Sequence, residues 1–198
     1  MKYPKTITKL IEYFQKFPSV GPKTAERYVF HLLKKSPQEL NDLAKNINSL
    51  KKDTQICNKC QAISETNPCE ICQDKNRDHS LLCVMANTQE MISLENTHKY
   101  NGLYFILGNL INTIENKGLE NIKIEELITK IEELKIKEVI LALSPTIEGE
   151  STVLYLSKLL KDKNIKISRL ARGLPLGSSL EYTDEITLSQ SLKYRNLL

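Results

Sequence analysis

The stretch CNKCQAISETNPCEIC, residues 57–72, divides the chain into two parts that differ in pattern. It contains the pairs Cys57-x-x-Cys60 and Cys69-x-x-Cys72, separated by eight residues. A two-residue gap lets the two thiolates of one turn point at a common centre, and two such turns complete a tetrahedron. Four sulfurs close the coordination shell and leave no position for an activated water. The spacing therefore predicts one structural zinc ion per chain.

The segment around these cysteines has few apolar residues. A stretch of about 20 residues of this kind cannot build its own core, and a bound metal would replace that core. Redox chemistry by the two Cys-x-x-Cys pairs is the alternative. The fifth cysteine, Cys83, lies in the apolar run Leu81–Met85 and is expected to be a buried strand residue.

Residues 1–53, before the cysteines, have helical periodicity. Apolar residues at helical spacing predict a first helix over 6–17 and a second over about 23–33. Ser36-Pro37 predicts the start of a third. The second helix is expected to bury Ala25, Tyr28, Val29, Leu32 and Leu33. The third carries Leu40, Leu43, Ile47 and Leu50.

The turn between the first two helices, PSVGPK at residues 18–23, resembles a helix-hairpin-helix motif, with Ser19 at a position where such hairpins usually have glycine. A tight turn into a helix N-terminus leaves backbone amides unpaired, and these amides favour a phosphate. We expect Gly21, Lys23 and Arg27 to contact DNA phosphates without regard to base sequence. A dimer contact is a second role for such a hairpin.

The positive charge is concentrated in the same region. Residues 1–50 hold nine Lys/Arg against four Asp/Glu, whereas the remaining 148 residues hold nineteen against twenty. A local basic field attracts polyanions, although a solvated helical face is the alternative interpretation.

After the cysteines, short apolar runs alternate with helical stretches. Strands are expected at 81–85, 103–107, 139–143 and 165–167, and helices at 88–94, 124–134 and 151–161. This alternation predicts a parallel sheet with helices on its faces. Glu148 and Glu150 are expected in a loop, 144–150, after the third strand, at the edge where such sheets bind ligands.

Several of these segments occur together in one known family. The chain resembles the RecR family of bacterial recombination mediators in a series of segments that occur in the same order. These are the hairpin, the four cysteines, Arg77-Asp78, Gly102-Leu-Tyr104, the Glu148-Gly-Glu150 stretch and the segment RLARGLPLGSSLEYTDEITL at 169–188. The resemblance implies an α+β multidomain fold. Its parts would be a helix-hairpin-helix domain (1–53), a four-cysteine zinc knuckle (54–76), a Toprim-like α/β domain with a parallel sheet (77–170) and a C-terminal Walker-B-like and helical segment (171–198).

The resemblance also implies a function. RecR proteins are non-enzymatic clamps that form dimer or tetramer rings, bind single- and double-stranded DNA, and act with RecO, and often RecF, to load RecA. Lys23 and Arg27 match positions expected to face DNA. Glu148 and Glu150 match an acidic loop that would face a basic partner or hold magnesium weakly. Such a protein would be cytoplasmic and nucleoid-associated. No apolar run in the sequence is long enough to cross a membrane, so no association with a membrane is expected.

Two other functions stay open. A Toprim-type metal-dependent nuclease or primase needs several carboxylates to hold magnesium. Ala86 stands where such enzymes place a glutamate after the first strand, and the chain contains no Asp-x-Asp. Separately, the stretch 105–118 departs from the pattern of the RecR family. A protein-only oligomerisation scaffold is the second alternative, and the uneven charge argues against it.

Overall fold

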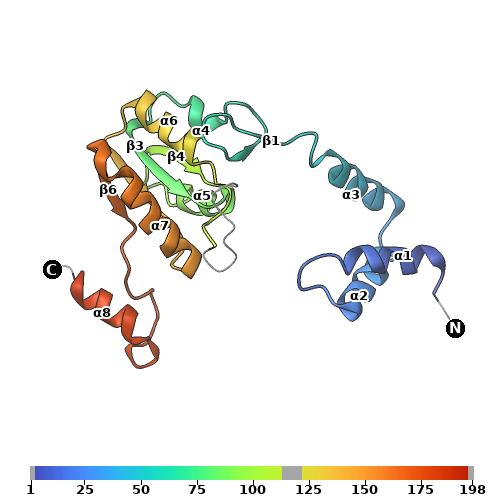
Figure 1. The fold of residues 1–198 in the computed structure, drawn as a ribbon. Coiled ribbons are helices and arrows are strands. Elements are labelled where there is room, and N and C mark those ends of the chain that lie inside the picture. Colours follow the sequence, from blue (N-terminus) through green and yellow to red (C-terminus); the bar gives the residue numbers. More distant parts are fainter. Residues whose placement is uncertain (1–2, 113–121, 196–198) are drawn as a thin grey trace. The chain divides into compact units, whose positions relative to one another are not determined.

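The computed structural model describes residues 3–112 and 122–195, so residues 113–118 of the divergent stretch lie outside the described part (Figure 1). The chain forms two compact units, Met1–Thr54 and Gln55–Leu198. Among the described residues, no helix is long and apolar enough to cross a membrane.

The first unit consists of three helices, as the periodicity predicts. They are α1 (Lys5–Phe14), α2 (Pro22–Leu32) and α3 (Pro37–Ser49). The start of α3 is fixed by a capping box, in which Ser36 accepts from the backbone of Glu39 and the Glu39 side chain accepts from the backbone of Ser36. Two residues of α2, Ala25 and Val29, are buried between the helices.

Part of the face that the second helix is expected to bury is exposed, which corrects the expectation for that helix. Tyr28 and Leu33 of the second helix are 42% and 59% exposed. The apolar residues of the third helix are also exposed: Leu40, Leu43, Ile47 and Leu50. Helical periodicity identifies an apolar face, and it does not show that the same chain covers that face.

The second unit begins with the cysteine segment. Strands β1 (Gln55–Ile56) and β2 (Ile63–Ser64) form a short antiparallel hairpin, and α4 (Glu70–Gln73) follows. We call residues 55–73 the knuckle.

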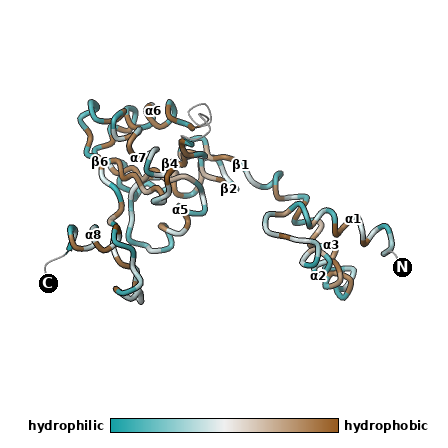
Figure 2. Tube along the Cα trace, turned by 60° about the horizontal axis from the view of Figure 1, so that its bottom comes forward, coloured by the Kyte–Doolittle hydropathy of each residue, from teal (hydrophilic) through white to brown (hydrophobic). Residues whose placement is uncertain are grey.

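A four-stranded parallel sheet forms the centre of the second unit, which confirms the predicted sheet. Its strands are β3 (Asp78–Met85), β4 (Gly102–Ile106), β5 (Glu138–Leu141) and β6 (Lys166–Arg169), in the order β4-β3-β5-β6. Its helices are α5 (Thr88–Glu95), α6 (Ile124–Leu134) and α7 (Ile147–Leu160). Hydrophobic, brown segments gather around β4 and β6 in Figure 2. The main core lies between the strands and helices α6 and α7, and a second cluster joins α5 and the cysteines to the sheet.

Helix α7 starts earlier than the sequence analysis expected. Thr146 caps it by accepting a hydrogen bond from the backbone of Gly149 at 3.1 Å, so Glu148 and Glu150 lie in the first helical turn and not in a loop. Gly149 is required there, because a Cβ atom would lie 1.9 Å from the carbonyl oxygen of Ser144.

Strand β4 lies at one edge of the sheet, and three of its outward backbone groups are paired. The Gly102 carbonyl accepts from Arg77 at 3.1 Å, and the Tyr104 carbonyl accepts from Lys130 at 3.3 Å. The Ile106 N–H donates to the carbonyl of Cys60 in the knuckle at 2.8 Å. The knuckle, Arg77 and Lys130 thus cover an edge that would otherwise be open to another strand.

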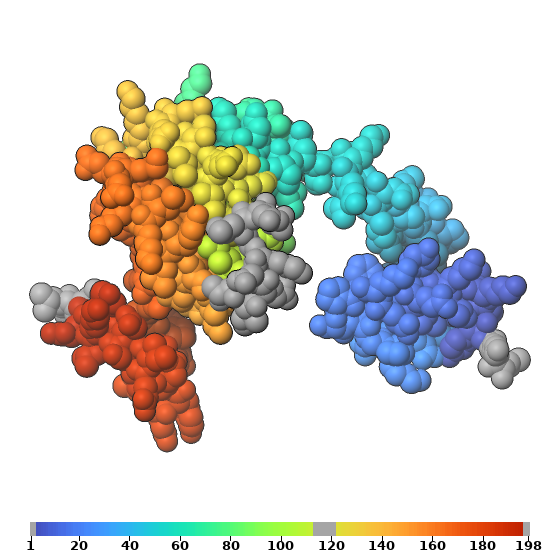
Figure 3. Space-filling model, in the orientation of Figure 1, coloured from blue at the N-terminus to red at the C-terminus, as the bar shows by residue number. Residues whose placement is uncertain are grey.

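The chain ends in a 3-10 turn, η3 (Leu180–Tyr182), and helix α8 (Glu185–Lys193), capped by Asp184. Figure 3 shows this segment in red, as a lobe that projects from the α/β body. Its large apolar side chains are exposed, with Tyr182 85% and Ile186 72% accessible.

Candidate functional site

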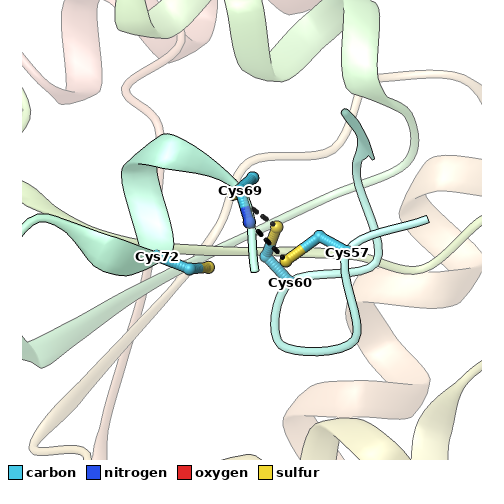
Figure 4. A group of neighbouring side chains, drawn as sticks. All are labelled: Cys57, Cys60, Cys69 and Cys72. Carbon is cyan, nitrogen blue, oxygen red and sulfur yellow. Dashed lines mark hydrogen bonds between the residues drawn. The ribbon is translucent and has the colours of Figure 1, made fainter. Parts of the chain in front are cut away.

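The four cysteines of the knuckle converge on one point, as predicted (Figure 4). Cys57 and Cys60 follow strand β1, whereas Cys69 and Cys72 come from the start and the body of α4. All four sulfurs lie within 4.8 Å of one another, and none is in a disulfide. Three of the four are buried outright and Cys72 is 9% exposed, so the centre is shielded from water.

This geometry fits a tetrahedral metal ion. With Zn–S bonds of about 2.3 Å, the edge of a regular ZnS₄ tetrahedron is about 3.8 Å. The sulfurs of Cys60 and Cys69 are 3.6 Å apart, close to that edge. A set of four thiolates with no other donor suits zinc and leaves no open position for substrate.

Hydrogen bonds hold the two halves of the knuckle together. The side chain of Asn67 accepts from the backbone of Asn58 at 2.9 Å, and the backbone N–H of Cys69 donates to the sulfur of Cys57 at 3.3 Å. Gln61, directly after the second cysteine, has a positive φ of 65°, which closes the first turn. Contacts of this kind orient the ligands of a metal site.

Hydrogen bonding and burial shift the pKa values of the cluster cysteines and of a nearby lysine. Cys60 and Cys69 share a hydrogen bond, which raises the pKa of Cys60 and lowers the pKa of Cys69 to about 2. Lys130 of α6 lies close by, with only 8% of its surface exposed. Burial lowers the pKa of Lys130, while the negative charges of the cysteines, that of Cys72 first, act in the opposite direction.

The candidate DNA contacts lie at the N-terminus of α2. No side chain caps this terminus in the described part of the chain, because its N-cap is Gly21. The side chain of Lys23 is 95% exposed and lies 3.3 Å from Glu26, and Arg27 is exposed one turn later. The terminus therefore presents backbone amides and two cations to solvent.

In the hairpin turn, the left-handed backbone conformation is adopted by Ser19 and not by Gly21. Ser19 has a φ of 61°, the left-handed conformation that glycine adopts most easily, whereas Gly21 has an ordinary φ of −81°. Nothing lies within 4 Å of a Cβ atom built on Gly21. Its missing side chain leaves open space at the helix terminus.

The two predicted acidic residues differ in their surroundings. Glu150 lines a cavity of about 860 Å³ at the carboxyl edge of the sheet, and Glu148 is not among the described residues lining it. Glu150 forms ion pairs with Arg169, at 3.3 Å, and with Arg172. These arginines already balance its charge, which a magnesium ion would otherwise do.

A third carboxylate at this edge was missed by the sequence analysis. Glu90 accepts from the hydroxyl of Ser144 at 3.0 Å and from the backbone of Ala86 at 3.3 Å. The only sequence signal was its place in the first turn of α5, three residues after the Asn87 cap. The roles of Lys130, Arg169 and Arg172 had no local signal, because their partners are distant in sequence.

Comparison with known proteins agrees with this arrangement. The sequence matches the Toprim domain family over residues 80–171, the RecR helix-hairpin-helix family over 7–51 and the RecR C-terminal family over 173–196. It is 43% identical to the recombination protein RecR of Moorella thermoacetica over 198 residues, which is 100% of both chains. It is also 43% identical to that of Staphylococcus saprophyticus over 195 residues, 98% of each chain. With this similarity along its whole length, the chain belongs to the RecR family.

Proposed function

We propose that this protein is a non-enzymatic, DNA-binding mediator of recombinational DNA repair that works as a clamp-like oligomer. Its relatives in Moorella and Staphylococcus are named recombination proteins. The observation that carries the proposal is the uncapped, cationic N-terminus of α2 within a helix-hairpin-helix segment.

The α2 terminus is suited to phosphate and not to bases. Its unpaired amides and helix dipole attract an anion, and Lys23 and Arg27 add two flexible positive charges. Groups of this kind contact the backbone that all DNA sequences share. The proposed partner is therefore single- or double-stranded DNA, bound without sequence preference.

The carboxyl edge of the sheet favours a non-enzymatic role. Magnesium-dependent phosphoryl transfer needs several carboxylates free to hold the metal. Ala86 offers none at the end of β3, and Glu150 is engaged by two arginines. Glu90 accepts hydrogen bonds from Ser144 and from the backbone of Ala86. Among the described residues, Glu148 has no ion-pair partner, which suits contact with a basic protein surface or a weakly held magnesium ion.

The exposed apolar faces support an oligomer. The α3 face, with Leu43, Ile47 and Leu50, is 43% to 65% exposed, and the α8 segment exposes Tyr182 and Ile186. Two separate apolar surfaces on one chain suit two different contacts between copies, which is what a ring of two or four chains requires.

The remaining parts of the proposal follow from the family. We infer that the knuckle holds one structural zinc ion, and that the protein acts in the cytoplasm on nucleoid DNA. RecO, and RecF where it is present, would be its protein partners in loading RecA.

Fluorescence anisotropy with a labelled single-stranded oligonucleotide tests the DNA contact. The wild type and the Lys23→Ala/Arg27→Ala double variant are titrated at several salt concentrations. Loss of two phosphate contacts should weaken binding and make the slope of log K against log salt shallower by about 1.4. The same titration is repeated with RecO present.

The matched control is Lys51→Ala/Lys52→Ala, which removes the same charge from an exposed turn of the same unit. It should change the slope less than the α2 variant. If the α2 variant kept the wild-type slope and affinity, the protein-only scaffold would be the better description.

A further inference from the structure

Lys130 of α6 joins the metal-binding loop to the sheet. Its ammonium donates to the carbonyl oxygen of Lys59 at 2.7 Å and to that of Tyr104 at 3.3 Å. Lys59 lies between the first two cysteines of the knuckle, and Tyr104 lies in the middle of the edge strand β4. One buried cation therefore holds two backbone segments 45 residues apart in sequence.

A buried lysine needs a counter-charge. Lys130 is 8% exposed, and no carboxylate forms an ion pair with it in the described part of the chain. Burying an unbalanced ammonium is costly. The nearest source of negative charge would be the metal-bound cysteine thiolates, because the Lys59 carbonyl that Lys130 binds lies between Cys57 and Cys60. A zinc ion with four thiolates carries a net charge of −2, so Lys130 offsets part of it.

The same side of β4 binds the knuckle at a second point. The backbone N–H of Ile106 donates to the carbonyl of Cys60 at 2.8 Å. A third contact joins the knuckle to the start of α5, where the Ile63 N–H donates to the hydroxyl of Thr88 at 3.0 Å. Movement of the Cys57–Cys60 loop would break the contacts of Lys130 and Ile106 together.

We propose that Lys130 is a positioning residue for the metal centre, which balances the charge of the four thiolates and links metal binding to the edge of the sheet. This inference rests on the proposed zinc site. Outer contacts that orient and balance metal ligands typically change metal affinity 10- to 100-fold when they are removed.

Cobalt(II) titration of the reduced, metal-free full-length protein tests the proposal. Cobalt in a tetrahedral four-thiolate site gives a characteristic visible spectrum, and zinc competition then gives the zinc affinity. Lys130→Met keeps the length of the side chain and removes the charge. We expect the same tetrahedral spectrum with an affinity at least about tenfold weaker, and near wild-type affinity for Lys130→Arg.

Lys123→Met is the matched control. Lys123 also contacts the knuckle, through the side-chain oxygen of Gln61 at 2.6 Å, but it does not bond to the carbonyls that Lys130 holds. Its variant should lose less than about threefold in metal affinity, below the usual range for removing an outer contact. Equal losses for Lys123→Met and Lys130→Met would overturn the specific role of Lys130.

The outcomes separate the two proposals. If the wild type formed no tetrahedral cobalt complex, the zinc site itself would be wrong, and this inference with it. If the wild type bound cobalt and Lys130→Met bound it equally well, only this inference would fail.

Hydrogen exchange of the wild type covers the case in which Lys130→Met does not fold. Adding a chelator should release the Ile106 amide from protection, because its acceptor is the carbonyl of Cys60. The amide of Val84, in the central strand β3, should remain protected. Unchanged protection of Ile106 after metal removal would contradict the link between metal and sheet edge.

Discussion

The backbone N–H of Ile106 donates a hydrogen bond of 2.8 Å to the carbonyl oxygen of Cys60, so a cysteine of the metal cluster is bonded directly to the edge strand of the sheet. The knuckle is therefore part of the α/β unit and not a separate subdomain. Its folding is tied to the edge of the α/β body, and a change in its metal should affect that edge as well.

Replacement of one cluster cysteine should release the metal. Cys57→Ser removes one of four thiolates whose sulfurs lie within 4.8 Å of one another. We expect the variant to lose stoichiometric zinc, measured by elemental analysis, and to be less soluble than the wild type. Cys83→Ala is the control, because Cys83 lies in strand β3 outside the cluster and its variant should keep one zinc per chain.

Ser19→Gly should stabilise the helical unit. Ser19 has a φ of 61°, where a side chain is disfavoured by about 1–2 kcal/mol and glycine is not. The greater freedom of glycine in the unfolded chain offsets part of this, which leaves a gain of about 0.5–1 kcal/mol. Native-state hydrogen exchange of the α2 amides measures it. Gly21→Ala, at an ordinary φ in open space, should not reduce their protection, and faster exchange in Ser19→Gly would contradict the assignment.

Glu95 should contribute to stability at neutral pH and lose that contribution in acid. Its hydrogen bond from Arg77, and then that from Tyr104, lowers the pKa of Glu95 below its usual value of 4.5. A carboxylate whose pKa is lower in the folded state stabilises the fold above pH 4.5, and this contribution disappears as the pH falls through the folded-state pKa.

Urea unfolding at a series of pH values measures this contribution. Glu95→Gln should be less stable than the wild type at pH 7 and should lose less stability below pH 4.5. Glu126→Gln, an exposed carboxylate of α6, serves as the control and should follow the wild-type curve. Parallel curves for Glu95→Gln and the wild type would exclude a role for the ion pair in acid sensitivity.

Much of the α/β body could be predicted from sequence, because its strands are short apolar runs between helical stretches. Helix α6 was predicted at its observed bounds, Ile124–Leu134. The start of α7 differs from the prediction, which placed residues 144–150 in a loop, because the Thr146 cap begins the helix at Ile147. Gly149 serves close packing against the backbone of Ser144, a contact that no local pattern encodes.

The cysteine cluster was also predictable, because the two-residue gap within each pair lets both sulfurs reach one metal ion. The charged residues that surround the cysteine cluster and the acidic residues could not be predicted from the sequence. Lys130 meets Lys59 across 71 residues, and Arg172 meets Glu150 across 22. Such pairs depend on the order of strands in the sheet, which periodicity does not give. For the same reason, sequence alone did not show that the apolar faces of α3 stay exposed.

Because Cys83 is buried in the sheet, its reactivity can distinguish local opening of the knuckle from global unfolding. Its thiol is fully buried, and burial raises the pKa of Cys83 to about 12, so a thiol reagent cannot reach or activate it in the folded body. A chain that loosens only its knuckle would expose four reactive sulfhydryls, whereas a chain that unfolds throughout would expose all five. Counting labelled thiols by mass spectrometry would therefore report how far each molecule has come apart.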